Sequence, residues 1–250
     1  EIIKSLELKK ELLDKNKISQ WKKQISEWQS QHGLNHKMYL CETDDNPIMP
    51  QAVVQHVYNI TKGKAFVTSD VGQHQMFAAQ YYHFDEPRKW INSGGLGTMG
   101  FGLPAAMGVK LAFPSDEVVC ITGEGSIQMC IQELSTCTQY NLPIKIININ
   151  NEALGMVKQW QDMNYGGRHS ASTYQSSLPN FVELAESYGH VGIKIEKNSD
   201  LKSGLEKAFM QKDKLVFVDV YVDPNEHVYP MLVAPNGSLR DMWLDKDTKT

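Results

Sequence analysis

The sequence predicts an α/β fold: a doubly wound, mainly parallel six-stranded sheet with helices on both faces. Helical and strand patterns alternate from Pro47 onward, which is typical of parallel strands joined by helices. The strand-like segments are short runs rich in Val and Ile, as expected of strands buried on both faces. With 41% hydrophobic and 22% charged residues, the composition is typical of a globular domain.

Six strands are expected where β-branched and apolar residues gather, from "AFVTSD" to "LVFVDVYV". Their ranges are 65–70, 89–93, 117–123, 144–150, 191–195 and 215–222. Helices are expected between them, where apolar residues recur at helical spacing, over 47–61, 72–82, 103–113, 128–140, 155–163, 181–189 and 200–210. Pro104 falls in the first turn of its helix, where proline is tolerated. Residues 164–178 are expected to form a polar loop.

Residues 1–46 are expected to form a linker and an N-terminal helix, and residues 47–250 the α/β domain. Residues 1–37 carry eight Lys against five acidic residues, with Trp21, Ile25 and Trp28 at helical spacing. We expect this helix to dock through these three side chains, because the interspersed acids disfavour a nucleic-acid or membrane surface. The chain starts with Glu rather than Met, so we expect it to be a fragment of a longer protein.

Charge and hydropathy argue against several classes of partner. The net charge of −4 gives no basic field for nucleic acid. No apolar run approaches the length of a membrane span, and the N-terminus lacks the apolar region and small-residue cleavage site of a signal peptide. The cysteines lack C-x-x-C spacing, so free thiols and a reducing, cytoplasmic compartment are expected. They are Cys41, Cys120, Cys130 and Cys137.

One glycine-rich segment, "SGGLGTMGFG", matches the dinucleotide fingerprint as Gly95-x-Gly97-x-x-Gly100. Such a match is weak by itself. A nicotinamide site requires an acidic residue about 20 residues on, at the end of the next strand, whereas the nearest later acids, Asp116 and Glu117, precede that strand. The alternative is that these glycines let the loop and the following helix approach the sheet closely. This is expected to hold for Gly100 and Gly102.

A second motif predicts a Mg²⁺–diphosphate site. Glu124, between two glycines, follows one strand in "TGEGS", and Asn151 follows the next strand 27 residues later. Mg²⁺ prefers oxygen ligands, and carboxylate and amide oxygens at neighbouring strand ends provide them. A helix starting near Ser126 would direct free N–H groups toward the anion. The alternative is structural: Glu124 caps a helix, and Asn150 and Asn151 form a turn.

The motifs closely resemble those of the acetohydroxyacid synthases, also called acetolactate synthases, in their catalytic large subunits. The resemblance covers about residues 47–245 and rests on five segments: "TSDVGQHQMFAAQ", "INSGGLGTMGFGLPAAMG", "VVCITGEGSIQMCIQELST", "NNEALGMVKQWQDM" and "EHVYPM". It implies the C-terminal domain that binds the diphosphate of thiamine diphosphate. In the family, a domain that supplies the activating glutamate and a middle domain that binds FAD come first. Neither is found here, so the chain alone is expected to be inactive.

The resemblance also implies roles for individual residues. Glu124, Asn151 and the carbonyl of Ala153 match the Mg²⁺ ligands. The Gly97 carbonyl matches the acceptor for the cofactor's amino group, and Met99 matches the residue that bends the cofactor. The other residues matching the cofactor cleft are Val71, Gly72, Gln73, His74, Gly123, Gly125, Ser126, Gly155, Met156, Val157 and Trp160. Without the resemblance, Met99, Met156 and Val157 would be assigned to the core.

The implied reaction is carbanion chemistry supplied by the cofactor. Pyruvate loses CO₂ and its remaining two carbons add to a second 2-oxo acid, either pyruvate, giving 2-acetolactate, or 2-oxobutyrate. Trp160 is expected to form a wall of the acceptor site, and residues 225–231 either a lid or a packed tail. The implied partners are a second copy in a homodimer and a small regulatory subunit.

One residue departs from the family pattern. The family has Asp where this chain has Glu124, and the extra methylene adds about 1.5 Å of reach, which puts the metal affinity in doubt. Two alternatives remain: another thiamine diphosphate-dependent 2-oxo acid decarboxylase or oxidase, and a non-catalytic cofactor-binding module. Trp160 in "GMVKQW" argues against the first.

Overall fold

The structure is a computed structural model that describes residues 1–10, 14–32, 39, 43–174, 176–232 and 237–245. The chain divides into two compact units, residues 1–38 and 39–250. The first unit contains the helices α1 (Ile2–Leu8) and α2 (Lys15–His32). The rings of Trp21 and Trp28 meet edge to face, with centroids 5.5 Å apart, and about half of each side chain is exposed. Docking of this helix through Trp21, Ile25 and Trp28 stays a prediction.

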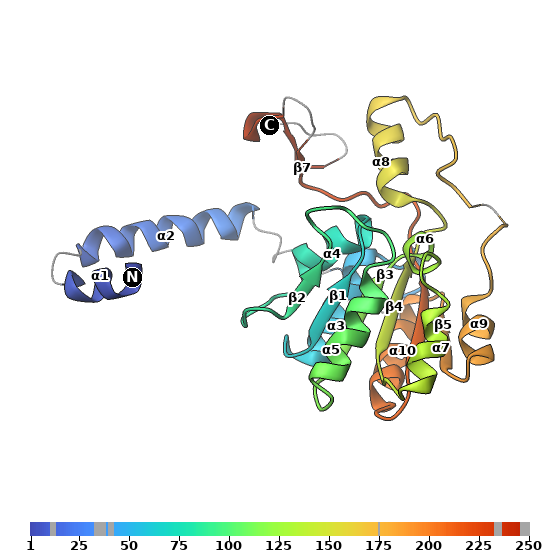
Figure 1. Ribbon diagram of the computed structural model, residues 1–250. Coiled ribbons are helices and arrows are strands. Elements are labelled where there is room, and N and C mark those ends of the chain that lie inside the picture. Colours follow the sequence, from blue (N-terminus) through green and yellow to red (C-terminus); the bar gives the residue numbers. More distant parts are fainter. Residues whose placement is uncertain (11–13, 33–38, 40–42, 175, 233–236, 246–250) are drawn as a thin grey trace. The chain divides into compact units, whose positions relative to one another are not determined.

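The second unit is built on a wholly parallel six-stranded sheet, as predicted (Figure 1). Its strands are β1 (Phe66–Ser69), β2 (Trp90–Asn92), β3 (Val118–Thr122), β4 (Lys145–Asn150), β5 (Val191–Ile195) and β6 (Val216–Tyr221), in the order β2-β1-β3-β4-β6-β5. The strands β1, β3 and β4 are buried along their full length. Burial on both faces explains why these strands are rich in Val, Ile and Thr.

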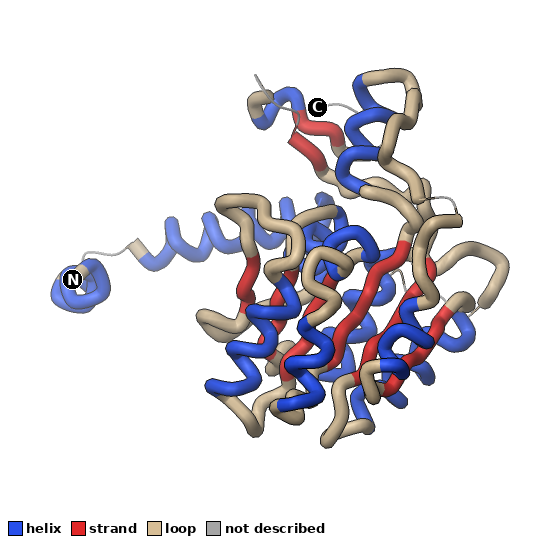
Figure 2. Tube along the Cα trace, turned by 45° about the vertical axis from the view of Figure 1, so that its right-hand side comes forward, coloured by secondary structure: helices blue, strands red, loops and turns tan. Residues whose placement is uncertain are grey.

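Helices cover both faces of this sheet (Figure 2). One layer contains α5 (Gly102–Ala112), α7 (Glu133–Gln139) and α9 (Phe181–Ser187), whose apolar side chains share a core with β1, β3, β4 and β6. The other layer contains α3 (Pro50–Thr61), which packs against α4 (Gln73–Tyr81) and α10 (Asn198–Met210). In the first layer, the rings of Phe181 and Phe217 stack with centroids 5.7 Å apart.

The predicted helix over 128–140 is wrong in its first part. The structure has a four-residue helix, α6 (Glu124–Ile127), then a turn, and α7 starts only at Glu133. In the turn, backbone N–H groups bond to the third preceding carbonyl, as in Cys130 N to Ile127 O at 3.2 Å, which winds the chain too tightly for an α-helix. The thiols of Cys120, Cys130 and Cys137 are nevertheless free and buried, as expected; Cys41 lies outside the described residues.

The strand order places a topological switch between β1 and β3. The chain passes from β1 to β2 on one side and returns to β3 on the other. Ligands of such sheets bind at the carboxyl ends of the strands beside the switch. Of the remaining elements, α8 (Gly155–Asn164) follows β4 in the sequence. After β6 come β7 (Met231–Leu232), η3 (Leu239–Asp241) and β8 (Met242–Trp243). Among the described helices, none has the length and apolar character needed to cross a bilayer.

The stacked pair in the core generates a stability prediction. Phe217→Ala should lower the free energy of unfolding by about 3–5 kcal/mol, because it leaves a cavity beside Phe181. Met210→Ala is the control: its side chain is 76% exposed, so the change should stay within about 0.5 kcal/mol. Urea denaturation of both variants measures these differences. Equal losses would contradict the proposed location of the core.

Candidate functional site

Three loops meet at the carboxyl ends of β1, β3 and β4. Because these strands are adjacent and parallel, with Ser69 beside Ile121 and Thr122 beside Asn148, the residues that follow them gather at one edge. They enclose a cavity of about 230 Å³. Its lining residues are Pro50, Val71, Gly72, Gln73, His74, Phe77, Gly97, Met99, Gly123, Glu124, Gly125, Ser126, Ile149, Asn151, Ala153, Leu154, Gly155, Met156 and Val157.

The cavity gathers every site residue named from the sequence except Trp160. It also contains Pro50, Phe77, Ile149 and Leu154, which sequence reasoning missed. Phe77 and Ile149 belong to a helix and a strand and are almost wholly buried. Their patterns are those of ordinary core residues, so the sequence carried no signal that they face a cavity.

Glu124 is buried in this site, with 1% of its side chain exposed. It is the first residue of α6, but its Oε1 accepts a hydrogen bond from the N–H of Ala153 at 2.7 Å, across the cavity, instead of capping the helix. Burial raises the pKa of Glu124 to about 8. The described residues form no ion pair with this carboxylate, so it lies in a place that favours a bound cation. A helix does start near Ser126, as expected, but it begins at Glu124 and has only four residues.

The turn after β4 positions a second oxygen beside this carboxylate. The N–H of Ala153 also donates to Asn151 Oδ1 at 3.2 Å, so Glu124 and Asn151 direct oxygens toward one N–H. Asn150 Oδ1 accepts from the N–H of Glu152 at 3.1 Å, and Glu152 has a φ of 55°. Asn150 and Asn151 therefore do form a turn, as the structural alternative expected. The same turn brings the side chain of Asn151 beside Glu124.

Gln73 fixes the other end of the Asn151 amide. Asn151 Nδ2 donates to Gln73 Oε1 at 3.0 Å. A Cβ at Gly155 would overlap Gln73 Oε1 and lie 2.6 Å from Asn151 Nδ2. Glycine is thus required at residue 155 because the Gln73–Asn151 pair occupies the space of a side chain.

His74 presents an unpaired polar atom in the cavity. Its ring lies so close to two glycines that a Cβ at Gly123 would be 2.8 Å from Nδ1, and one at Gly72 would be 2.9 Å from Cε1. Nε2 is buried, and the described residues offer it no hydrogen-bond partner. Burial lowers the pKa of His74 to about 4, against the opposing effect of the Asp70 charge. A neutral ring can donate one hydrogen bond from Nε2 to an anion.

Tyr174 covers the loop that carries Glu124, a contact that sequence reasoning missed. A Cβ at Gly125 would overlap the Tyr174 hydroxyl. The loop of Tyr174 is held here by a bridge between Thr173 and Ala153. Burial raises the pKa of Tyr174, and the Glu124 carboxylate adds to the shift. No motif marked this residue, because it lies in a polar loop without periodicity.

The glycine-rich loop before α5 has the close contacts that were expected. A Cβ at Gly100, whose φ is 86°, would lie 2.8 Å from Met129 Cβ, and one at Gly102 would lie 2.9 Å from Asp70 Oδ2. The close-approach interpretation is confirmed for these two residues. Gly97 has a φ of 70° with open space around it, so its requirement for glycine comes from the backbone conformation.

Trp160 is not part of the cavity. Gly155, Met156 and Val157, in the first turn of α8, line it, whereas Trp160 lies one turn further on and is half-buried. Among the described residues, no three His, Cys, Asp or Glu side chains gather as a metal-binding group. The donors gathered in the cavity are instead one carboxylate, one amide oxygen and backbone groups.

Comparisons with known proteins agree with this geometry. A family model described as the thiamine pyrophosphate enzyme, C-terminal TPP binding domain, matches residues 70–220. Similar proteins include the acetolactate synthase isozyme 3 large subunit of Escherichia coli (strain K12), 58% identical over 237 residues, which are 94% of this chain and 40% of that protein. An acetolactate synthase large subunit of Cyanidium caldarium is 40% identical over 250 residues, 100% of this chain and 41% of that protein.

The chain therefore spans about 40% of the length of these relatives. The matched residues contain all three strand ends that form the cavity. The family model covers more than half of the chain, and on that ground the chain belongs to the thiamine pyrophosphate enzyme family, as its C-terminal TPP-binding domain.

Proposed function

We propose that this chain is the diphosphate-binding part of an acetolactate synthase large subunit. The intact enzyme would condense pyruvate with pyruvate or 2-oxobutyrate and release CO₂, a reaction of branched-chain amino acid biosynthesis. One observation carries the proposal: the 58% identity to the large subunit from E. coli extends over 94% of this chain.

The donor set of the cavity fits Mg²⁺. Glu124, Asn151 and the carbonyl of Ala153 would hold the ion, because Mg²⁺ takes hard oxygens and keeps the rest of its shell from phosphate and water. The buried Glu124 carboxylate, without a cation among the described residues, supports this assignment. A divalent ion would supply the missing charge and lower the pKa of Glu124 from about 8.

The rest of the cavity fits a diphosphate and an apolar ring. His74 Nε2, buried and unpaired, would donate to a phosphate oxygen together with Gln73. Gly123 and Gly125 keep the backbone open to the phosphates. Thiamine diphosphate, when bound, supplies the carbanion chemistry. Met99 would hold the cofactor bent, the Gly97 carbonyl would accept from its amino group, and the apolar wall would exclude water.

The remaining expectations from the resemblance belong to the same proposal. The intact protein would form a homodimer, bind FAD in a separate domain and pair with a small regulatory subunit. The three buried free thiols support a reducing, cytoplasmic compartment.

Substitutions of Glu124 test the metal site. Glu124→Ala should abolish Mg²⁺-dependent binding of thiamine diphosphate, because among the described residues that line the cavity Glu124 alone carries a carboxylate. Glu124→Asp should tighten binding, since it restores the shorter family ligand. Calorimetry on the intact protein, with and without Mg²⁺, measures both affinities. Unchanged binding by the alanine variant would disprove the ligand role.

The raised pKa of Glu124 predicts a pH dependence of the metal-free protein. The pKa of Glu124 is about 8 in the folded protein against an ordinary value of 4.5, so the folded state holds more protons than the unfolded state between these values. Its free energy of unfolding should fall as pH rises through this window. Glu124→Gln cannot ionise and should lack this contribution to the fall. Urea denaturation in the presence of a chelator, near both ends of the window, compares the variants; parallel pH profiles would contradict the prediction.

A substitution of Trp160 tests whether this residue selects the second 2-oxo acid, which accepts the two-carbon unit. Trp160→Leu in the intact enzyme should keep acetolactate formation but lose most of the preference for 2-oxobutyrate over pyruvate. A wall that contacts the extra methyl group discriminates by about 1–3 kcal/mol. A competition assay with both 2-oxo acids, read by mass spectrometry of the products, measures the ratio. Because wild type serves as the reference, the assay also tests the proposed reaction: products other than acetohydroxy acids would overturn it.

A thermal melt is the control for this variant. Trp160 is half-buried, so its truncation should cost less than the roughly 3–5 kcal/mol typical of a fully buried Trp. An unchanged product ratio with a large fall in melting temperature would show that Trp160 serves packing and not the acceptor site.

A further inference from the structure

We propose that Gln159 is a positioning residue: through Gln73, it sets which end of the Asn151 amide faces Glu124. The inference rests on the proposed function, because it takes Asn151 Oδ1 to be a metal ligand. Gln159 lies on α8 with 1% of its side chain exposed, and it does not line the cavity. It would act at the metal only through its neighbours.

The orientation of the Gln159 amide is fixed by backbone groups. The N–H of Val228 donates to Gln159 Oε1 at 3.0 Å, and Gln159 Nε2 donates to the carbonyl of Val228 at 2.9 Å. A backbone N–H cannot accept and a carbonyl cannot donate. A flipped Gln159 amide would lose both bonds in a buried place, so only one orientation is stable.

That orientation passes to Asn151 in two steps. Gln159 Oε1 accepts from Gln73 Nε2 at 2.8 Å, so Gln73 must direct its oxygen the other way. Gln73 Oε1 then accepts from Asn151 Nδ2 at 3.0 Å. The oxygen of Asn151 is left on the side of Glu124, where both side chains accept from the N–H of Ala153. Each step excludes the flipped amide.

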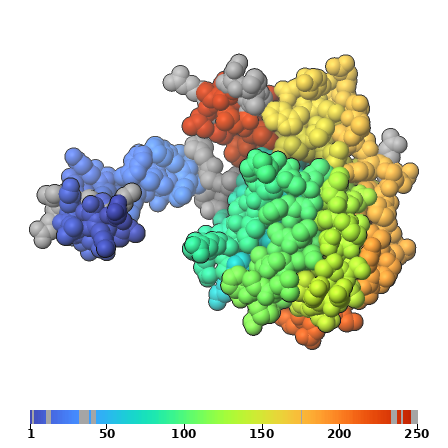
Figure 3. All heavy atoms as spheres, viewed as in Figure 1, coloured from blue at the N-terminus to red at the C-terminus, as the bar shows by residue number. Residues whose placement is uncertain are grey.

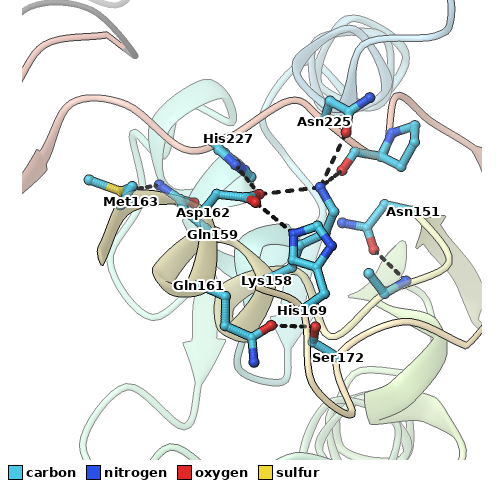
Figure 4. A network of polar contacts seen from close by, with 12 residues as sticks. Asn151, Lys158, Gln159, Gln161, Asp162, Met163, His169, Ser172, Asn225 and His227 are labelled. Carbon is cyan, nitrogen blue, oxygen red and sulfur yellow. Dashed lines mark hydrogen bonds and ion pairs between the residues drawn. The ribbon is translucent and has the colours of Figure 1, made fainter. Parts of the chain in front are cut away.

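The segment that carries Val228 is itself fastened to α8 (Figure 4). Lys158 Nζ donates to the carbonyl of Pro224 at 2.9 Å and to Asn225 Oδ1 at 3.2 Å. His227 Nε2 lies 2.9 Å from Asp162 Oδ2. In Figure 3, residues nearer the C-terminus, in red, lie beside the residues of α8, in yellow. The hydrogen-bond chain from Gln159 through Gln73 to Asn151 therefore starts from a backbone segment that side chains of α8 hold in place.

A flipped Asn151 would place an amide NH₂ group beside the metal and remove one of its oxygen ligands. The amide oxygen and nitrogen of Asn have nearly the same shape, so packing alone distinguishes them poorly. The hydrogen bonds from Gln159 through Gln73 to Asn151 make that distinction. Residues that orient metal ligands in this way typically change metal affinity by about 10–100-fold when they are substituted.

The first test is Gln159→Leu in the intact protein. The apparent Kd for Mg²⁺, titrated by calorimetry in the presence of thiamine diphosphate, should rise by about 10–100-fold. Gln161→Leu is the matched control: it removes a glutamine from the same helix whose bonds go to Ser170 and Ser172, and it should leave the Kd unchanged. A thermal melt of the metal-free variants reports loss of folding separately. An unchanged Kd in a folded Gln159→Leu variant would overturn the proposal.

The second test separates orientation from packing. In the Asn151→Asp variant both terminal atoms of the side chain are oxygens, so its orientation no longer matters for the metal. Gln73 Oε1 would then face a carboxylate oxygen for as long as Gln159 keeps Gln73 in its present orientation. In this background, Gln159→Leu should leave the Kd for Mg²⁺ unchanged or lower it. The same weakening in both backgrounds would show a structural role and overturn the inference. Absence of Mg²⁺-dependent binding in the wild type would instead overturn the metal site of the proposed function.

Discussion

Burial of the Glu124 carboxylate is the constraint on which the site depends. A charge in a place with 1% exposure is unfavourable unless hydrogen bonds and a cation compensate it. The protein provides one backbone bond, from Ala153, and places an amide oxygen beside it. Its described residues provide no cation at this position. The carboxylate lines a cavity of about 230 Å³, so the compensating charge has room to come from a ligand.

The polar side chains around this carboxylate are held in defined orientations as well as at defined distances. Gln159, Gln73 and Asn151 form a chain in which each oxygen accepts from the next nitrogen. This chain fixes the orientation of each amide only because its first member, Gln159, bonds to a backbone N–H and a backbone carbonyl. It joins α8 and the turn after β4 to α4, whose Gln73 lies 86 positions from Gln159 and 78 from Asn151 in the sequence. Gly155 belongs to the same arrangement, since any side chain there would separate Gln73 from Asn151.

The alternation of patterns was sufficient to predict the sheet, and the positions of Glu124 and Asn151 at strand ends indicated where a ligand would bind. Most other residues of the cavity were named only through the family resemblance. Glu124 and Asn151 follow strands directly, and parallel pairing brings such residues together. The break between α6 and α7 could not be predicted, because residues 128–140 have helical periodicity throughout. Tyr174 and Gln159 were missed for a related reason. Their roles come from contacts with residues more than 45 positions away, and no local pattern encodes them.

The parallel pairing of β1, β3 and β4 also links ligand supply to the lifetime of the protein. The cavity exists only when both pairings are complete, so the unfolded chain offers the ligand no comparable site. By mass action, a ligand present at a hundred times its Kd adds about 2.7 kcal/mol to the free energy of unfolding. A protein molecule without its ligand therefore unfolds far more often, and proteases cleave it correspondingly faster. Scarcity of the cofactor would thus reduce the amount of this protein, through degradation, as well as its occupancy.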